Sequence, residues 1–311
     1  MAYSLIATAR NEGPFILEWV AHHLSLGFDK IFVATNDCDD QTNLILDLIG
    51  QKWPIYRIEN SSPTPGNTFQ RSAVLKCLAH PEMGEKDWVL HIDIDEFLNI
   101  DAAEPDVATF IAPFKDADAV MILWKTFGDN NRSFWDGGSI LDGFHRCQGD
   151  FRDTAAKSFF RRDSFDDCTP HSPQTPRKPV AGLRIVTTGN LPVDALPIAN
   201  KRGGVLIPED FRTYQGACLN HYMHKSRDLV RFGRELRGDA NGRRAAWRRR
   251  TVGMPEYEMF NRNETADFSI QANRDARIEA LNGLIEIPGV LAAHYASQTW
   301  FFEQLQQLTK D

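Results

Sequence analysis

The stretch Trp88–Phe97, with the sequence WVLHIDIDEF, decides the fold class of this chain. Its first half is an apolar run of strand length, and its second half is an acidic cluster that begins where the strand is expected to end. Open α/β sheets bind their ligands at the carboxyl ends of the strands. The position of the cluster therefore indicates a strand and, directly after it, a candidate functional site.

The carboxylates of Asp93 and Asp95 are the candidate metal ligands of this site. Side chains alternate between the two faces of a strand, so both residues are expected to point the same way. Two carboxylates at such close range repel each other unless a cation lies between them. Hard oxygen ligands favour Mg²⁺ or Mn²⁺, which complete their shell with phosphate oxygens and water, so the pair predicts a metal that holds a nucleotide diphosphate. The alternative is an acidic loop without a ligand, because D-x-D triplets are common.

Short apolar runs alternate with helical patterns on both sides of this stretch. Such alternation is typical of an α/β fold with a mostly parallel sheet flanked by helices. The expected strands are 3–7, 30–35, 55–58, 88–92 and 119–123, and the expected helices between them are 14–27, 40–50 and 69–79.

The second half of the chain is expected to be rich in loops. Seven of the sixteen prolines lie between residues 170 and 208, where they exclude long regular elements. Helical patterns return at 227–237, 275–283 and 298–308. We therefore expect one continuous domain, with a regular first half, 1–125, and a second half with lid loops and C-terminal helices, 126–311.

Composition limits the classes of binding partner and indicates the cellular compartment. Hydrophobic residues make up 42% and charged residues 25% of the 311 residues, and the net charge of -7 argues against nucleic acid. The five cysteines contain no C-x-x-C pair, which favours a reducing cytoplasm over a disulfide framework. The first residues lack a basic leader, and no apolar run reaches the 18 residues of a membrane span, so any membrane contact is expected to be peripheral.

Three polar segments follow expected strands: Arg10-Asn11-Glu12, Thr35 to Thr42, and Asp93 to Phe97. Together they resemble the family 2-like glycosyltransferases of the GT-A fold. The spacing R-N-E-x-x-F-I-L-E-W-x-x-H-H-x-x-L-G-F, followed by D-I-D-E-F and by His221-Tyr222-x-x-Lys225-Ser226, resembles more narrowly the branch that includes the family 92-type enzymes. The resemblance covers residues 3–99, is patchy from 120 to 235 and is absent thereafter. It implies that 1–125 is a nucleotide-sugar-binding half and that 126–311 is an acceptor half.

The resemblance implies a set of nucleotide-binding positions: Ala9, Arg10, Glu12, Asn36, Asp39, Gln70, Arg71 and Asp93, with Lys157 and Lys225 as phosphate contacts. Asn36 stands where related enzymes often carry an acidic residue near the uracil or ribose. The residues alone leave other roles open: Arg10 and Glu12 as a surface pair, Asn11 and Asp40 as helix caps, and Arg71 as a solvated side chain.

Among the nine histidines, His221 is the one to which the resemblance gives a role, as the third metal ligand beside Asp93 and Asp95. An imidazole suits Mn²⁺ better than Mg²⁺. His22 and His23, on the first helix, are expected to be structural. His171 lies in the expected lid, where it is a weaker candidate for contact with a sugar or phosphate.

The resemblance implies a metal-dependent transfer of a sugar from a nucleoside diphosphate sugar, uridine-linked, to a hydroxyl acceptor such as a glycan, with inversion at the anomeric carbon. Inversion needs a carboxylate base near the acceptor hydroxyl. The sequence does not rank four candidates: Asp136, Asp142, Asp150 and Asp153. Glu96 is expected to orient the metal ligands. Two other classes stay open, a D-x-D phosphatase of the haloacid dehalogenase type and a non-catalytic nucleotide or carbohydrate-binding protein.

The segment 231–250 holds eight arginines. A run of charge is usually a solvated face, but these side chains are also able to bind anionic lipid, an anionic glycan or the diphosphate. A cytoplasmic protein with peripheral contact to the inner face of a membrane is consistent with this segment.

Overall fold

A computed structural model describes residues 1–151, 155–193, 205–233, 257–258 and 260–308. In the first part of the chain, short strands alternate with helices, as the sequence predicts. The strands are β1 (Tyr3–Ala9), β2 (Lys30–Thr35), β3 (Ile55–Glu59) and β4 (Trp88–His91), and the helices between them are α1 (Gly13–Ser25), α2 (Thr42–Ile49) and α3 (Phe69–Leu78).

The strands of the second part are spread more widely along the chain. They are β5 (Glu96–Ile100), β6 (Ala119–Thr126), β7 (Arg146–Cys147), β8 (Ala155–Arg161), β9 (Phe165–Cys168), β10 (Pro173–Pro176), β11 (Ile185–Thr187), β12 (Pro192–Val193), β13 (Val205–Leu206), β14 (Ala217–His221) and β15 (Thr265–Ala266). The helices in the described residues of this part are α4 (Val107–Ile111), α5 (Ile140–Gly143), α6 (Arg227–Arg231), α9 (Arg274–Ile285) and α10 (Val290–Leu308).

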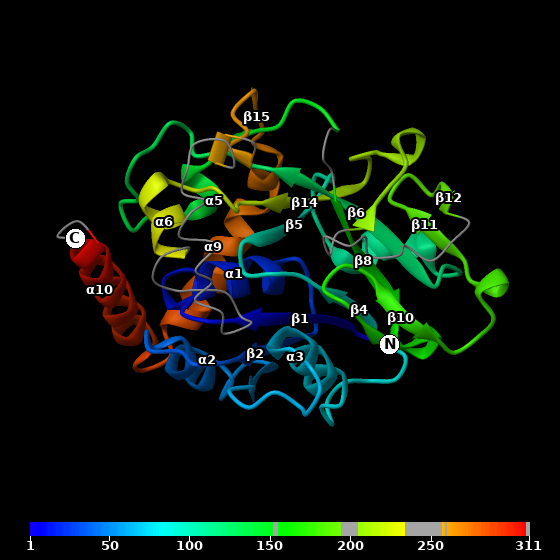
Figure 1. Cartoon of the computed structure of the whole chain (residues 1–311), viewed down its shortest axis with the longest axis horizontal. Coiled ribbons are helices and arrows are strands. Elements are labelled where there is room, and N and C mark those ends of the chain that lie inside the picture. Colours follow the sequence, from blue (N-terminus) through cyan, green and yellow to red (C-terminus); the bar gives the residue numbers. More distant parts are fainter. Residues whose placement is uncertain (152–154, 194–204, 234–256, 259, 309–311) are drawn as a thin grey trace.

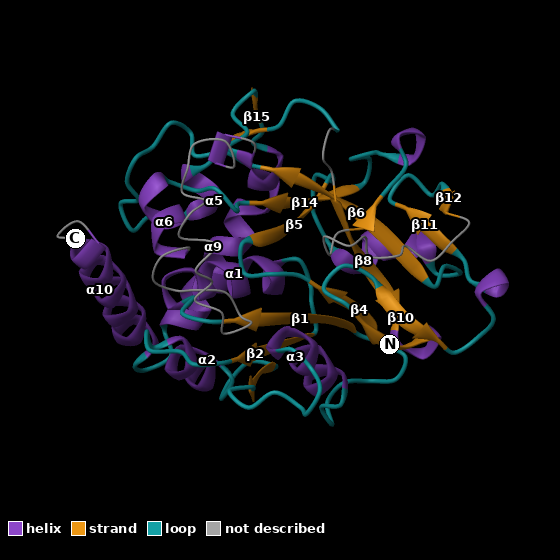
Figure 2. Ribbon diagram, in the orientation of Figure 1, coloured by secondary structure: helices purple, strands orange, loops and turns teal. Residues whose placement is uncertain are grey.

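One large sheet organises the molecule, with the strand order β12-β11-β6-β8-β4-β1-β2-β3 (Figure 2). The strands β3, β2, β1 and β4 run parallel to one another, and β8 is antiparallel to both β4 and β6. The strand β14 pairs in parallel with β6 and antiparallel with β5. The expected α/β class with a mostly parallel sheet is confirmed, and β1 to β4, β6 and β14 end at one edge, here called the carboxyl edge.

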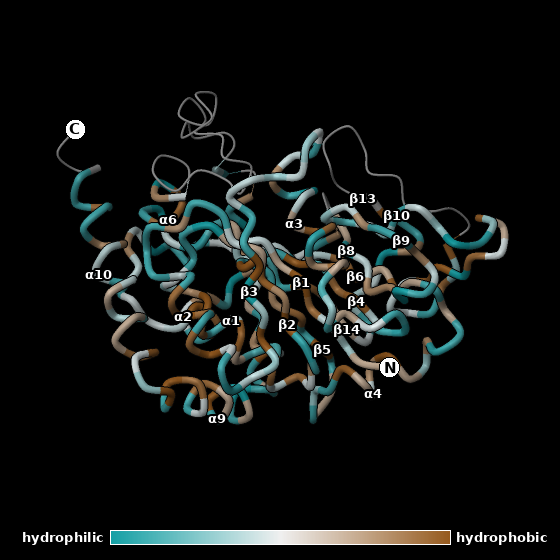
Figure 3. The backbone as a smooth tube through the Cα atoms, turned by 90° about the horizontal axis from the view of Figure 1, so that it is seen from below, coloured by the Kyte–Doolittle hydropathy of each residue, from teal (hydrophilic) through white to brown (hydrophobic). Residues whose placement is uncertain are grey.

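The two faces of the sheet carry two hydrophobic clusters, because neighbouring side chains of a strand point to opposite faces. Leu5 and Ala7 of β1 pack with α1, α2, α9 and α10, whereas Ile6 packs with α3. Figure 3 shows the central strands as hydrophobic tubes, and Figure 1 places α9 beside α1, with α10 along the outside. The sheet is therefore covered on both faces, which leaves the carboxyl edge as the place where loops and polar side chains gather.

The elements missed from sequence are mostly strands of the second part. The expected sheet contained neither β5, which begins directly after the acidic cluster, nor β14, which returns to it from residue 217. The C-terminal helix begins eight residues before its expected start at residue 298, at Val290. The helix expected at 227–237 is present from Arg227 to Arg231, and residues 234–237 lie outside the described residues.

No helix among the described residues combines the length and the apolar character that a membrane crossing requires.

Candidate active site

The acidic cluster forms a turn and does not continue the strand. The strand β4 ends at His91, and β5 begins at Glu96. The backbone N–H of Glu96 donates to the carbonyl of Asp93 at 3.1 Å, and the N–H of Asp93 donates to the Glu96 carboxylate at 3.1 Å. The argument that strand alternation makes Asp93 and Asp95 point the same way is therefore wrong, because both residues lie in the turn and each has its own partner.

Asp93 faces a buried ammonium group. The Lys157 Nζ atom, on β8, lies 3.0 Å from Asp93 Oδ2 and 3.3 Å from Glu96 Oε2, and the side chains of Lys157 and Glu96 are both 0% exposed. Burial opposes ionisation of Asp93, but the Lys157 charge outweighs it and holds the pKa of this carboxyl below its usual range. Burial raises the pKa of Glu96 well above its usual range despite the same ammonium. Lys157 thus neutralises part of the acidic turn from inside the protein and does not present its charge to a phosphate at the surface.

Asp95 faces His221 instead. The His221 Nε2 atom lies 3.8 Å from Asp95 Oδ1, and the Tyr222 N–H donates to the Asp95 carbonyl at 2.8 Å. Burial lowers the pKa of His221, although Asp95 and Asp93 act in the opposite direction. The ring is therefore neutral at pH 7, which is the form that binds metal. His221 is the last residue of β14 and pairs with Glu96 of β5, so it lies beside the turn although it is far from the turn in sequence.

The Asp95 carboxylate and the His221 imidazole are ligands of the kind that a divalent cation accepts. The Asp95 carboxylate is 25% exposed, and the buried His221 Nδ1 has no hydrogen-bond partner among the described residues. Nowhere in the described part of the chain do three His, Cys, Asp or Glu side chains already converge as a metal cluster. Asp95 and His221 fit a metal that takes its remaining ligands from phosphate and water, while one oxygen of Asp93 is engaged by Lys157.

A row of buried polar oxygens lies at the ends of β1, β2 and β3. Within the described residues, these atoms have no hydrogen-bond partner: Thr8 Oγ1, Thr35 Oγ1, Asn36 Oδ1 and Asn60 Oδ1. The three strands end at the same edge, since Ala9 pairs with Thr35 and the Asn60 N–H donates to the Thr35 carbonyl at 2.8 Å. Thr8 pairs with Ala34, so the side chains of Thr8 and Thr35 point to opposite faces of the sheet. Buried polar groups without partners are rare in native proteins, so these four oxygens mark a candidate site for a polar ligand or ordered water. The sequence prediction included Asn36 but missed the other three, whose signal was a polar residue at the end of each strand.

The loops after β1 and β2 are tied to each other. The Asp39 N–H donates to Asn11 Oδ1 at 2.7 Å, and the Glu12 N–H donates to Thr42 Oγ1 at 3.0 Å. The fully buried Asp40 accepts from the first amides of two helices, Gly13 N at 2.7 Å and Thr42 N at 3.1 Å. Asp40 therefore accepts hydrogen bonds at the starts of α1 and α2, as expected for a capping residue, although Gln41 occupies the N-cap position of α2. Asn11 joins the loops and does not cap α1.

The other expected nucleotide contacts surround these loops. Ala9 is buried at the end of β1, Arg10 and Glu12 are half-buried beside it, and Gln70 lies half-buried in the first turn of α3. Lys225 follows β14 and holds its ammonium 5.2 Å from the centre of the Phe15 ring, at the start of α1.

Arg71 has a structural partner. Its guanidinium forms a bidentate ion pair with Asp167 on β9 and donates to the Cys168 carbonyl at 3.1 Å. The interpretation of Arg71 as a solvated side chain is therefore wrong, and its contact with phosphate would require this pair to open.

The candidate base residues lie in different surroundings. Asp136 is exposed and accepts from the Gly138 N–H at 3.0 Å, and Asp142 is held by Arg277 at 2.6 Å. Asp150 lies 3.3 Å from Arg262, and Asp153 is outside the described residues.

The loop of Asp150 is linked to the candidate metal ligand His221. Gln148 Nε2 donates to the Tyr214 hydroxyl at 2.8 Å, and that hydroxyl donates to the Trp124 carbonyl at 3.1 Å. The Trp124 ring lies 4.4 Å from that of His221 and 5.3 Å from that of His171. Of the described candidates, Asp150 is the one connected to His221 through such contacts. Of the eight arginines in the segment 231–250, only Arg231 belongs to the described residues.

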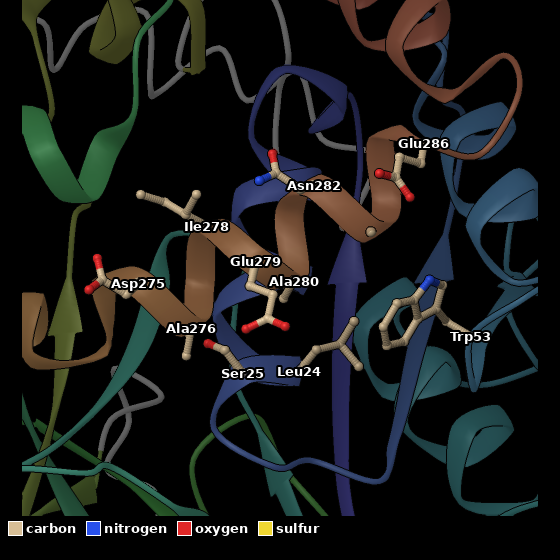
Figure 4. A pocket seen from close by; sticks show the side chains of 11 residues that line it. Leu24, Ser25, Trp53, Asp275, Ala276, Ile278, Glu279, Ala280, Asn282 and Glu286 are labelled. Atoms are coloured by element: carbon tan, nitrogen blue, oxygen red, sulfur yellow. The ribbon is translucent and has the colours of Figure 1, made fainter.

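A separate pocket lies between the end of α1 and α9 (Figure 4). Leu24, Ser25 and Trp53 line one side, and α9 residues such as Glu279 and Asn282 line the other. The end of α1 is far along the helix from the loop after β1, so this pocket lies toward the opposite edge of the sheet. None of the predicted site residues lines it.

The fold and this edge define an α/β protein with candidate ligand-binding side chains at the ends of its parallel strands. No protein-family model matches the chain. Over 92 residues it is 30% identical to a glycosyltransferase family 92 protein from Ricinus communis, a match that spans 29% of this chain and 16% of the relative. The chain is thus a distant relative of a family 92 glycosyltransferase and spans about a sixth of that relative's length.

Solved structures are similar over parts of the chain. Residues 1–349 of TarS from S. aureus are 19% identical with a TM-score of 0.34, and the similarity covers 52% of this chain and 47% of that one. The same protein in complex with UDP is 20% identical with a TM-score of 0.30, covering 44% and 38%. HddC from Yersinia pseudotuberculosis is 14% identical with a TM-score of 0.27, covering 42% and 65%.

Proposed function

We propose that this protein is a metal-dependent glycosyltransferase that moves a sugar from a uridine diphosphate sugar to a hydroxyl of a glycan or other acceptor, with inversion. The observation that carries this proposal is the meeting of Asp95 and His221 at the same edge as the unpartnered oxygens of β1 to β3. A carboxylate and an imidazole that suit a metal, at the same edge as polar groups for a nucleoside, fit a nucleoside diphosphate. The family 92 relative supports the transferase class.

In this proposal, Asp95 and His221 hold Mn²⁺ or Mg²⁺, with Asp93 beside them. A bound divalent cation neutralises the negative charge that grows on a leaving diphosphate. The loops that contain Ala9, Arg10, Glu12, Asn36 and Asp39, together with Gln70, border the nucleoside. Lys225, next to α1, contacts the phosphates.

The transfer itself is a direct displacement. The acceptor oxygen forms a bond to the anomeric carbon while the bond to the diphosphate breaks, and the diphosphate leaves with the electron pair. A carboxylate takes the proton of the acceptor hydroxyl. Among the described candidates we assign this role to Asp150, because its loop contacts Tyr214 and, through it, the Trp124 that packs against His221.

Calorimetric titration with UDP, in the presence and absence of Mn²⁺ and with GDP for comparison, tests the proposal. We expect Mn²⁺-dependent binding of UDP and weaker binding of GDP. Preference for GDP would keep the class of enzyme and change the donor. The absence of binding by either nucleotide would contradict the proposal, and metal-dependent hydrolysis of p-nitrophenyl phosphate would then support a phosphatase.

A further inference from the structure

The ammonium of Lys157 is a positive charge that is fully buried inside the protein. Its side chain is 0% exposed, in a strand enclosed between β4 and β6. The centre of the Trp124 ring lies 5.7 Å from the Lys157 Nζ atom. A charge so deep in a protein is tolerated only when it is paired, and the acidic turn supplies both of its ion pairs.

The three carboxyl groups at the acidic turn differ in whether they lie next to the Lys157 ammonium. Asp93 and Glu96 share Lys157, at 3.0 and 3.3 Å. Asp95 has no Lys or Arg within ion-pair distance among the described residues, and its charged or chargeable neighbour is His221 at 3.8 Å. A metal that enters the site therefore meets one carboxylate without a counter-ion, together with one imidazole.

Two ligands of this kind hold a divalent ion weakly, because such sites owe much of their affinity to the number of charged ligands. The Lys157 charge lowers the attraction further, since it lies against the carboxylate beside the metal position. The oxygens of a diphosphate would restore both the negative charge and the missing ligands.

We propose that Lys157 is a positioning residue and built-in cation that keeps the affinity of the site for free metal low, so that the metal is held firmly only together with a nucleoside diphosphate. This inference rests on the proposed function, because it concerns the same metal and the same diphosphate. It makes metal and nucleotide binding mutually dependent, and each raises the affinity of the other by the same factor.

The test compares two variants that differ only at Lys157. Glu96→Gln gives residue 96 a fixed neutral side chain, and Lys157→Met in that background removes the ammonium while keeping a side chain of similar length. Mn²⁺ affinity is measured by calorimetry without nucleotide. We expect the double variant to bind Mn²⁺ about tenfold more tightly than Glu96→Gln, because Asp93 is released and one positive charge is lost.

A purely structural role for Lys157 predicts the opposite sign, because a loosened turn would bind metal less well. Equal or weaker Mn²⁺ affinity in a folded double variant, checked by circular dichroism, would therefore overturn the inference. The matched control is Lys125→Met, which removes a partly buried lysine that is paired with Asp267 at 2.5 Å. It should leave the Mn²⁺ affinity unchanged, and a tenfold gain there would show that the effect is not specific to Lys157.

If the double variant does not fold, Glu96→Gln and the unchanged protein still test the proposal. In both, we expect saturating UDP to raise Mn²⁺ affinity at least about tenfold. Tight Mn²⁺ binding that UDP does not improve would overturn the inference alone, whereas failure to bind either Mn²⁺ or UDP would also contradict the proposed function.

Discussion

Asp93 and Asp95 are two residues apart in sequence, yet their side chains have different partners. Asp93 pairs with the buried Lys157, and Asp95 pairs with His221 on β14. The cause is the turn between β4 and β5, which replaces strand alternation with a local reversal. Asp95 is therefore the carboxylate on which metal-dependent binding is expected to depend most.

We expect Asp95→Ala to weaken Mn²⁺-dependent UDP binding at least about 100-fold, because it removes the carboxylate of the metal-binding pair. The fold should remain, since the Asp95 carboxylate is 25% exposed and its contact with the protein is the distant one with His221. Calorimetry measures the binding, and circular dichroism measures the fold. Asp116→Ala is the charge-matched control, because Asp116 is exposed and precedes β6 at the opposite edge of the sheet. UDP affinity unchanged by Asp95→Ala would exclude Asp95 as a ligand.

The sequence predicted residue types at the site better than residue partners. The acidic cluster and His221 were recognised because they carry distinctive motifs. Lys157 was expected to contact phosphate, and Arg71 to be solvated or bound to phosphate. Their ion pairs with Asp93 and Asp167 join residues 64 and 96 positions apart. Such pairs depend on how the strands are arranged, which a local pattern does not contain.

At the scale of elements, the helix α1 is fastened to β5 by two histidines. The His22 ring lies 2.7 Å from the Leu98 carbonyl, and the Leu98 N–H donates to the His23 ring at 3.3 Å. The other nitrogen of His23 lies 2.8 Å from the Trp19 carbonyl. The structural role expected for these residues agrees with this arrangement, which holds α1 against the strand that leaves the acidic turn.

These histidines predict how stability depends on pH. Burial lowers the pKa of His22 to about 3 and that of His23 well below its usual value, so the folded protein keeps both rings neutral. The unfolded chain takes up protons on these rings below about pH 6.5. Their contribution to stability is therefore complete above that pH and is lost as the pH falls toward the folded values.

We expect His23→Leu to lower the free energy of unfolding by about 1–3 kcal/mol at pH 7.5, because the Leu98 N–H and the Trp19 carbonyl lose a buried partner. Between about pH 6.5 and 5, the variant should lose stability less steeply than the unchanged protein, because one titrating group is gone. Urea unfolding at a series of pH values measures both effects. Parallel stability curves over this interval would show that His23 is not held neutral by the fold.

The elements that the sequence did not predict are those that depend on distant pairing. The strand β5 is not predicted because it follows a four-residue turn, and an acidic motif after a strand usually marks the start of a loop. The strand β14 fits between β5 and β6 although about 90 residues separate it from the end of β6. The regular alternation of the first part, by contrast, predicted β1 to β4 and α1 to α3 within a few residues.

At the scale of the whole molecule, the candidate site joins both parts of the chain. The turn after β4 and the ends of β1 to β3 come from the first 100 residues, whereas Lys157 and His221 come from β8 and β14 of the same sheet. A ligand at the carboxyl edge thus contacts elements on both sides of residue 125. We propose that the halves 1–125 and 126–311 unfold as one cooperative unit.

Thermal unfolding with and without ligand tests this proposal. A ligand that binds only the folded protein stabilises it by about 2.7 kcal/mol at 100 times its dissociation constant. For a domain of this size we expect UDP with Mn²⁺ to raise the midpoint of a single transition by about 5 °C. Differential scanning calorimetry measures the midpoint and the number of transitions, and Asp95→Ala should show little rise. Two transitions, of which UDP and Mn²⁺ move only one, would show that the halves fold separately and that the site belongs to one of them.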